Sequence, residues 1–236
     1  MEGSLLSILF LGFILGIKHA IEPDHVIAVS TIASQSKKLW RSSLAGVFWG
    51  IGHTATLFLI GIILIIMKGN IPEEWAMSFE FLVGIMLVYL GIASILSFKK
   101  VHHHEHQHNE VVHDHFHHRA EGAPHLHEHK KISYRKSLLI GLVHGLGGSA
   151  AMVLLTMSSV TSVWEGAVYI LIFGLGTTIG MLGFTTIIGI PFVLSAKKES
   201  VNLKLTRITG LISTAFGLYY MYNLGVTEGL FKIWMQ

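Results

Sequence analysis

The chain contains no cysteine and few charged residues, and each scarcity excludes a class of protein. Without cysteine there are neither disulfides nor thiolate metal ligands, so any metal must be bound by nitrogen and oxygen atoms. Charged residues make up 13% of the chain and hydrophobic residues 51%, an apolar excess that a soluble domain does not need. With a mean hydropathy of +0.59, the 236 residues predict one membrane domain and no sizeable soluble domain.

The formal net charge of +3 and the pI near 9.1 do not indicate a nucleic-acid partner. The basic residues lie at the ends of apolar runs rather than in one patch, so we interpret them as signals that orient the chain in a membrane. We therefore expect the lipid bilayer, and no nucleic acid, among the partners of this chain.

Six apolar runs predict an all-α integral membrane protein with six transmembrane helices, because about 20 residues are needed to cross the hydrocarbon core as a helix. The runs cover residues 4–34, 43–67, 79–98, 137–160, 166–195 and 207–224. The first lacks the basic start and small-residue cleavage site of a signal peptide, so we expect a mature span. It is long enough to break, and Pro23, which cannot donate a helical hydrogen bond, predicts the break.

Lysine and arginine residues in the connecting segments predict the orientation of the spans. The first, third and fifth connections carry most of them and are expected in the cytoplasm, whereas the second and fourth are acidic and are expected outside. We therefore predict a multi-pass protein of the cell (plasma) membrane with both termini external.

The third connection, 99–136, contains a histidine-dense stretch, 102–129, which holds 12 of the 16 histidines. Its low apolar content predicts a disordered cytoplasmic loop rather than a folded element. We expect it to bind divalent metal nonspecifically, either to hold incoming metal or to sense an excess of it. Transport with an unchanged dependence on metal concentration after deletion of 102–129 would exclude both roles.

The two halves of the chain, 1–98 and 137–236, resemble each other. Three matches lie about 125 residues apart: 16–19 with 141–144, 48–54 with 172–178, and Gly84 and Gly91 with Gly210 and Gly217. Chance matches are the alternative, because glycine is frequent in membrane helices. Since each half has three spans, an odd number, we predict two inverted three-helix repeats, an arrangement that recurs in secondary transporters.

The first span carries five ionisable side chains within eight residues: Lys18, His19, Glu22, Asp24 and His25. A charged side chain at the centre of a membrane helix costs about 2.5–3.5 kcal/mol on insertion scales, so a cluster of them indicates a functional site. On a regular helix His19 and His25 would be about 240° apart and could not face one cation. We therefore predict an irregular helix, in which Pro23 also leaves the His19 carbonyl free as a further oxygen ligand.

The other two histidines outside the loop, His53 and His144, lie within apolar runs beside glycines that let helices approach closely. A single membrane histidine is more often a packing residue than a ligand, but a cluster of imidazoles and carboxylates indicates a metal site. Such ligands suit nickel, cobalt, zinc and copper rather than magnesium or calcium. We predict a metal site built from His19, Asp24 and His25, with His53, His144 and Glu22 as further members.

Residues 18–25, Lys-His-Ala-Ile-Glu-Pro-Asp-His, resemble the His-x4-Asp-His signature of the NiCoT family of nickel/cobalt transporters, particularly its shorter UreH-like members associated with urease. Gly52-His53-Thr54 is similar to a second motif of that family. The resemblance implies a secondary transporter for Ni²⁺ or Co²⁺, mostly an importer. It also implies that the metal is a substrate, that there is no cofactor and no enzymatic activity, and that cytoplasmic nickel-handling proteins are partners.

Three other functions stay open at this point. The signature does not distinguish import from export, so a nickel/cobalt exporter is one of them. Histidines with Asp24 could also bind zinc and activate water in an intramembrane hydrolase, although an enzyme does not require inverted repeats. A metal-dependent sensor or scaffold is the third. An ATP-driven pump is not expected, because the glycines within 145–150 lack the Lys-Ser/Thr of a phosphate loop.

Overall fold

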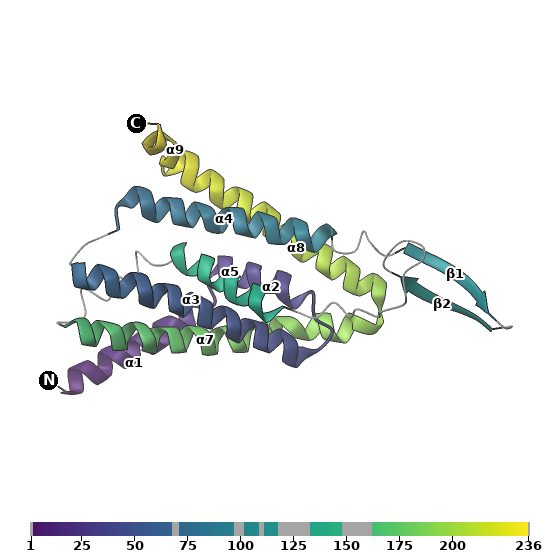
Figure 1. Ribbon diagram of the computed structural model, residues 1–236, viewed down its shortest axis with the longest axis horizontal. Coiled ribbons are helices and arrows are strands. Elements are labelled where there is room, and N and C mark those ends of the chain that lie inside the picture. The colour runs from purple at the N-terminus through teal and green to yellow at the C-terminus, as the bar shows by residue number, and fades with distance from the viewer. Residues whose placement is uncertain are drawn as a thin grey trace.

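The computed structural model describes residues 2–67, 71–96, 102–108, 111–117, 133–147 and 162–235 (Figure 1). The elements in chain order are α1 (Glu2–His19), α2 (Pro23–Ala33), α3 (Leu39–Met67), α4 (Glu73–Leu96), β1 (His102–His108), β2 (Val111–His117), α5 (Tyr134–Gly147), α7 (Val163–Leu194), η1 (Ser195–Lys197), α8 (Glu199–Tyr222), η2 (Asn223–Thr227) and α9 (Leu230–Trp234). All of the long elements are helices, and α3, α4, α7 and α8 run lengthwise along the molecule.

Three described helices are long and apolar enough to cross a membrane: α3, α4, and α7 extended through η1 to Lys197. Together α1 and α2 form a fourth candidate span, bent by 57° at the break between them. At about 1.5 Å per residue, even the 24 residues of α4 exceed the roughly 30 Å of the hydrocarbon core. The described residues therefore contain three candidate spans, or four when the bent pair is counted as one, and these match four of the six predicted runs.

The fourth and sixth apolar runs do not appear as complete apolar helices. α5 covers the start of the run 137–160, and the remainder, 148–160, lies outside the described residues. α8 is 24 residues long, but Glu199, Lys204 and Arg207 in its first half lower its apolar content. Only the later part of α8 matches the sixth predicted run.

The break in the first span lies between His19 and Pro23, as the sequence predicts. Pro23 occupies the first turn of α2, where its missing N–H removes no helical hydrogen bond. One detail of the prediction is wrong, because the N–H of Glu22 donates to the His19 carbonyl at 3.1 Å and that oxygen is not left free. Pro23 therefore starts a second helix after a tight turn, and the turn itself satisfies the carbonyl.

Glycines let the helices pack with their backbones close together. α3 packs against both α7 and α5, α1 packs along α7, and α4 packs along α8. A Cβ atom at Gly16 in α1 would overlap the carbonyl oxygen of Phe173 in α7, and one at Gly52 in α3 would overlap that of Leu138 in α5. Close packing of this kind drives helix association in lipid, where burial of apolar surface gives no advantage.

Gly16→Ala is expected to destabilise the protein by about 1–3 kcal/mol, because the added methyl group overlaps a backbone atom that cannot rotate away. Gly183→Ala is a matched control in α7, since a Cβ atom there meets nothing within 4 Å. Thermal unfolding in detergent should show a lower midpoint for Gly16→Ala only. Equal midpoints for the two variants would contradict the close contact between α1 and α7.

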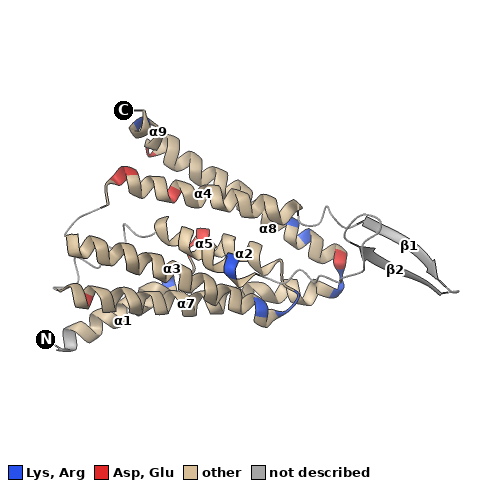
Figure 2. Cartoon of the chain, viewed as in Figure 1, with Lys and Arg blue, Asp and Glu red and all other residues tan. Residues whose placement is uncertain are grey.

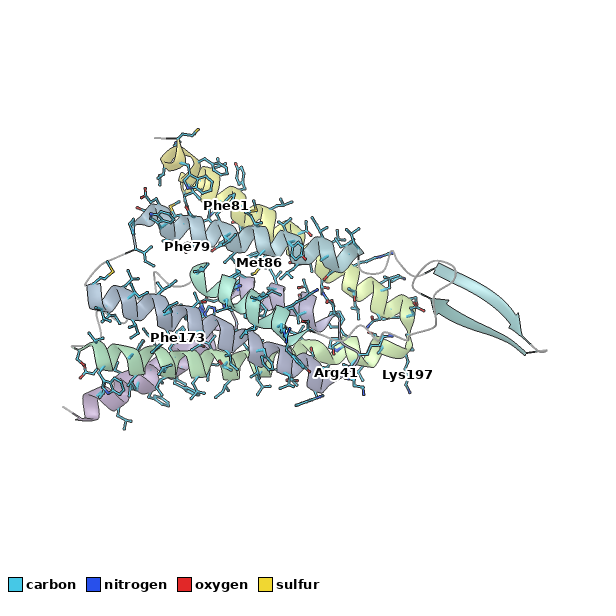
Figure 3. All side chains as sticks on the ribbon, viewed as in Figure 1. Arg41, Phe79, Phe81, Met86, Phe173 and Lys197 are labelled. Carbon is cyan, nitrogen blue, oxygen red and sulfur yellow. The ribbon has the colours of Figure 1, made fainter. Side chains whose placement is uncertain are left out.

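The two ends of the helical bundle differ in charge (Figure 2). Most of the lysines and arginines, drawn blue, gather toward one end, where α3 and α8 begin, and we call this the basic end. At the opposite end, here called the acidic end, α4 and α7 begin, and their first turns carry Glu73, Glu74 and Glu165. Arg41 and Lys197 are labelled at the basic end in Figure 3. Between the ends, large apolar side chains such as Leu59, Ile63 and Leu175 are exposed, which suits a surface in contact with lipid.

Strands β1 and β2 lie in the histidine-dense stretch, for which the sequence predicts no folded element. They pair antiparallel, with His102 opposite His117 and His108 opposite Val111. Pairing satisfies backbone donors and acceptors without a buried core, so a segment of low apolar content can adopt it. The hairpin extends beyond the basic end of the helices (Figure 1).

Candidate metal centre

The four histidines outside the loop come together from four helices. His19 is the last residue of α1, His25 lies in the first turn of α2, His53 lies in the middle of α3, and His144 lies near the end of α5. The ring centroids of His25 and His144 are 4.0 Å apart, those of His19 and His25 4.4 Å, and those of His19 and His53 5.1 Å. His25 and His144 thus lie side by side although they are 119 positions apart in the chain, and we call this group of four histidines the histidine centre.

Asp24 links two of these rings. Its Oδ1 lies 3.2 Å from His25 Nδ1, and its Oδ2 lies 2.8 Å from His144 Nε2. A carboxylate only accepts hydrogen bonds, so these contacts require the proton of each ring to be on the nitrogen that faces Asp24. The opposite nitrogens, His25 Nε2 and His144 Nδ1, then carry the lone pairs with which neutral imidazole binds a metal.

Glu22 orients His19 in a similar way. Glu22 Oε2 lies 2.9 Å from His19 Nδ1, and His19 Nε2 on the other side of the ring lies 3.1 Å from His53 Nε2. The Glu22 side chain is 49% exposed and that of His19 only 15%. Glu22 therefore contacts the histidine centre from its edge, and its carboxylate belongs to neither of the donor sets described below.

His25, His53 and His144 are almost completely buried, each with 1% of its surface exposed. One nitrogen of each ring has no hydrogen-bond partner in the described part of the chain: His25 Nε2, His53 Nδ1 and His144 Nδ1. Buried polar atoms are hydrogen-bonded in the large majority of cases, so unpaired nitrogens on three neighbouring rings indicate that another partner binds there. A cation that accepts nitrogen lone pairs is such a partner.

Two overlapping sets of three donors can be drawn from these residues: His19, His25 and His53, or Asp24, His25 and His144. In each set, one ligand atom of every residue lies within 4.8 Å of the others. Bonds of about 2.0–2.1 Å from nitrogen to a metal would draw the donors closer together. His25 belongs to both sets and is therefore the common member of the histidine centre.

Aromatic side chains pack around the histidines. The ring of Trp49 is stacked on His25 at a centroid distance of 6.1 Å and an angle of 12°, and the ring of Phe173 lies 5.5 Å from that of His19. Trp49 and Phe173 are both buried, and Figure 3 labels Phe173 within the helical bundle. These rings hold the imidazoles in place and keep water away from part of the histidine centre.

A cavity of about 350 Å³ lies beside the histidine centre. His19, Asp24, His25 and His144 form part of its wall, and the remaining polar lining comes from Lys18, Glu22, Glu80, Tyr169 and Tyr220. The hydroxyl of Tyr220 donates a hydrogen bond to Glu80 Oε2 at 3.1 Å. Since a water molecule occupies about 30 Å³ in the liquid, the cavity has room for a cation with part of its hydration shell.

Three residues that lie at the histidine centre or its cavity are not predicted from the sequence: Glu80, Tyr220 and Trp49. Glu80 carries a signal, because it is the one carboxylate in the apolar run 79–98, but its place near the start of the run favours an acidic loop. Tyr220 and Trp49 carry no signal, because an aromatic residue in an apolar run is typical of ordinary packing.

The chain is a multi-pass membrane protein. It has a polar centre, in which buried histidines lie near the break between α1 and α2 and beside a cavity lined with charged side chains. The chain belongs to the family described as the cytochrome c biogenesis protein transmembrane region, which matches residues 7–219. That match includes every residue of the histidine centre and most of α8.

Several named proteins are similar to the chain, and three of them are described below. The urease accessory protein UreH of Bacillus sp. (strain TB-90) is 64% identical over 98% of each chain. A putative nickel/cobalt efflux system of Methanocaldococcus jannaschii is 29% identical over 88% of each chain, and its name contains the metals that the motif at 18–25 implies. Chloroplast protein FOR GROWTH AND FERTILITY 1 of Arabidopsis thaliana is 28% identical over 88% of this chain and 56% of its own length. No solved structure matches the chain.

Proposed function

We propose that this protein is a secondary transporter that moves divalent nickel, cobalt or both across the cytoplasmic membrane, in the direction of uptake. The observation that carries the proposal is the histidine centre, in which four imidazoles and Asp24 meet at a helix break. Ionisable residues inside a membrane mark ion pathways, and nitrogen and oxygen donors without sulfur suit nickel and cobalt. The names of the Bacillus and Methanocaldococcus relatives support the same class of function.

In this proposal the metal is bound by the imidazoles of His19, His25 and His53. Asp24 uses both of its oxygens to accept hydrogen bonds from His25 and His144, which leaves His25 Nε2 free to bind. A carboxylate behind a ligating histidine is a recurrent arrangement that fixes the ring proton and makes the ligand more basic. Asp24 also offsets part of the divalent charge, and His144 provides a further imidazole beside the set.

Reciprocal glycine contacts support the proposal of two inverted repeats. Gly16 of α1 lies against the backbone of Phe173 in α7, and Gly141 of α5 lies against the backbone of Trp49 in α3. The two glycines are 125 positions apart, and the two aromatic residues are 124 positions apart. The interface between α1 and α7 is thus matched by the interface between α5 and α3, as expected if two halves rock around a shared site.

The same relation holds for α4 and α8. Gly84 lies against the backbone of Gly217, and Gly91 lies against that of Gly210. Each glycine of α4 has its counterpart 126 positions later in α8. These contacts support a domain division into repeat one at 1–98, the histidine-rich connection at 99–136 and repeat two at 137–236, with three spans in each repeat.

Charge supports the proposed orientation. The basic end, beyond which the β1–β2 hairpin lies, would face the cytoplasm, and the acidic end would face outside. Incoming metal would then reach the cytoplasm near the histidine-dense stretch, which could pass it to cytoplasmic nickel-handling proteins. Both chain termini would be external.

Export is the second candidate, because one relative is named as an efflux system. Radiolabelled nickel in cells that produce the protein tests the direction. Import predicts that these cells contain more nickel than cells with the empty vector, and that the excess disappears with His19→Asn. Lower nickel content and greater nickel tolerance would establish export instead.

Acid is expected to inhibit the transport of metal. Only neutral imidazole binds a cation, and the reference pKa of histidine is about 6.5, so protons compete with metal as the pH falls. Uptake at a low metal concentration should fall by roughly tenfold between about pH 7.5 and pH 5.5. Uptake rates over a range of metal concentrations at each pH separate this competition from a change in maximal rate. Rates that do not change between about pH 5 and 8 would contradict the proposed ligands.

A further inference from the structure

Glu80 and Tyr220 line the cavity beside the histidine centre, and the proposed metal site does not use them. Glu80 lies on α4 and Tyr220 on α8, two helices held close together at Gly84 and Gly217. The hydrogen bond from the Tyr220 hydroxyl holds the Glu80 carboxylate at a defined position in the cavity wall. Both side chains are partly exposed, so a molecule or ion in the cavity can reach them.

No cation balances the charge of Glu80 within the described ranges of the chain. Lys18 lines the same cavity, yet neither it nor any other described lysine or arginine forms an ion pair with Glu80. The phenol of Tyr220 fixes the carboxylate but brings no positive charge. An unpaired carboxylate in a membrane helix that faces a cavity is typical of an ion pathway.

The cavity lies between the histidine centre and the acidic end. Glu80 is seven residues from Glu73, the first residue of α4, which places it about 10 Å from that end. Tyr220 lies in the last turn of α8, and Tyr169 lies in the second turn of α7. All three residues therefore belong to the acidic-end half of their helices.

The opposite half of the molecule has no such carboxylate at the equivalent positions. With the offset of 126 residues that relates α4 to α8, Glu80 corresponds to Thr206 and Tyr220 corresponds to Ser94. Thr206 and Ser94 are neutral, and both are completely buried at 0% exposure. The path between the two ends is therefore asymmetric in charge.

We propose that Glu80, positioned by Tyr220, is a transient oxygen ligand that captures the divalent cation between the acidic end and the histidine centre. This inference rests on the proposed transport function. One carboxylate binds nickel or cobalt more weakly than three imidazoles do, so it concentrates the cation in the cavity without retaining it. Glu80 therefore lowers the metal concentration at which transport from the acidic end is half-saturated. It does not change the final distribution of metal across the membrane, which the metal gradient sets.

Nickel flux in liposomes of fixed protein orientation, with metal added at one end at a time, tests this role. Glu80→Gln should raise the half-saturating nickel concentration at the acidic end about tenfold and leave that at the basic end within about twofold. Glu80→Asp should recover part of the loss, and Tyr220→Phe should show a smaller shift of the same kind. Glu228→Gln, a change of another acidic-end carboxylate, which pairs with Asn223 outside the cavity, should behave as the unaltered protein.

A second measurement separates capture from folding. Cobalt binding to the purified Glu80→Gln protein, followed by visible absorption, should match that of the unaltered protein, because the histidine centre is intact. An unchanged half-saturating concentration at the acidic end, or an equal shift at both ends, would overturn the role of Glu80 while the transport function stands. If Glu80→Gln abolished the pH dependence of transport without changing the half-saturating nickel concentration, the capture role would also be overturned, and Glu80 would be assigned to proton transfer. Absence of flux in the unaltered protein would overturn both proposals.

Discussion

Replacing His25 by asparagine is expected to reduce metal flux by at least about 100-fold. His25 is the one residue common to both sets of three donors, and it is also a hydrogen-bond partner of Asp24. Loss of a partner behind a ligand alone typically costs 10–100-fold in metal affinity, and the loss of a shared ligand should cost more. Asparagine keeps a polar side chain in the site, so the change removes the imidazole without introducing an apolar surface. Initial rates of nickel flux in proteoliposomes, at matched protein content, measure the effect.

A control for this variant lies on the same helix. Thr31 is completely buried in α2, and its hydroxyl donates to the Ala28 carbonyl at 2.7 Å, away from the cavity. Thr31→Val should keep the flux within about twofold, because it removes only a local hydrogen bond worth about 1 kcal/mol. Flux through the His25→Asn protein with an unaltered half-saturating concentration would show that the metal does not use this imidazole.

Asp24→Asn is expected to lower metal affinity by about 10–100-fold while the metal keeps its imidazole ligands. The carboxylate accepts from His25 at 3.2 Å and from His144 at 2.8 Å, whereas an amide offers one accepting oxygen and one donating nitrogen. One ring must then turn over or lose its bond, so His25 presents its lone pair less often. Titration with cobalt measures the affinity, and X-ray absorption of the bound metal counts the imidazoles.

The same absorption spectra distinguish two roles of Asp24. If Asp24 acts from behind His25, the coordination shell of the variant should match that of the unaltered protein at saturating metal. Loss of an oxygen ligand in Asp24→Asn would instead indicate the donor set of Asp24, His25 and His144. An unchanged cobalt affinity of the Asp24→Asn protein would contradict both roles of Asp24.

The long helices of this protein are predictable from local sequence, because a segment inside a lipid bilayer has no water to satisfy its backbone groups. Runs such as 43–67 and 79–98 must satisfy their backbone groups internally, and a helix is the way for a single segment to do so. The break at Pro23 was equally predictable, because proline and the ionisable cluster lie in the same segment. The boundaries of α8 were not, since its charged first half, from Glu199 to Arg207, is helical only in the context of its neighbours.

The histidine centre was predictable in membership and only partly in geometry. The cost of placing His19, Asp24 and His25 in a membrane draws attention to them without any knowledge of the fold. The partners of each ring depend on which helices meet, and no local pattern indicates that Asp24 holds His144 across 120 positions of chain. The local sequence of Glu80 favours a loop for the same reason, because only the packing of α4 on α8 brings this residue into the cavity wall.

Flux of radiolabelled nickel through the purified, intact protein in liposomes tests the central claim most directly. Liposomes with the unaltered protein should accumulate nickel down an imposed gradient far faster than protein-free liposomes, and liposomes with the His25→Asn protein should resemble the protein-free ones. Equal rates in all three preparations, with the protein folded and correctly inserted, would contradict transport through the histidine centre.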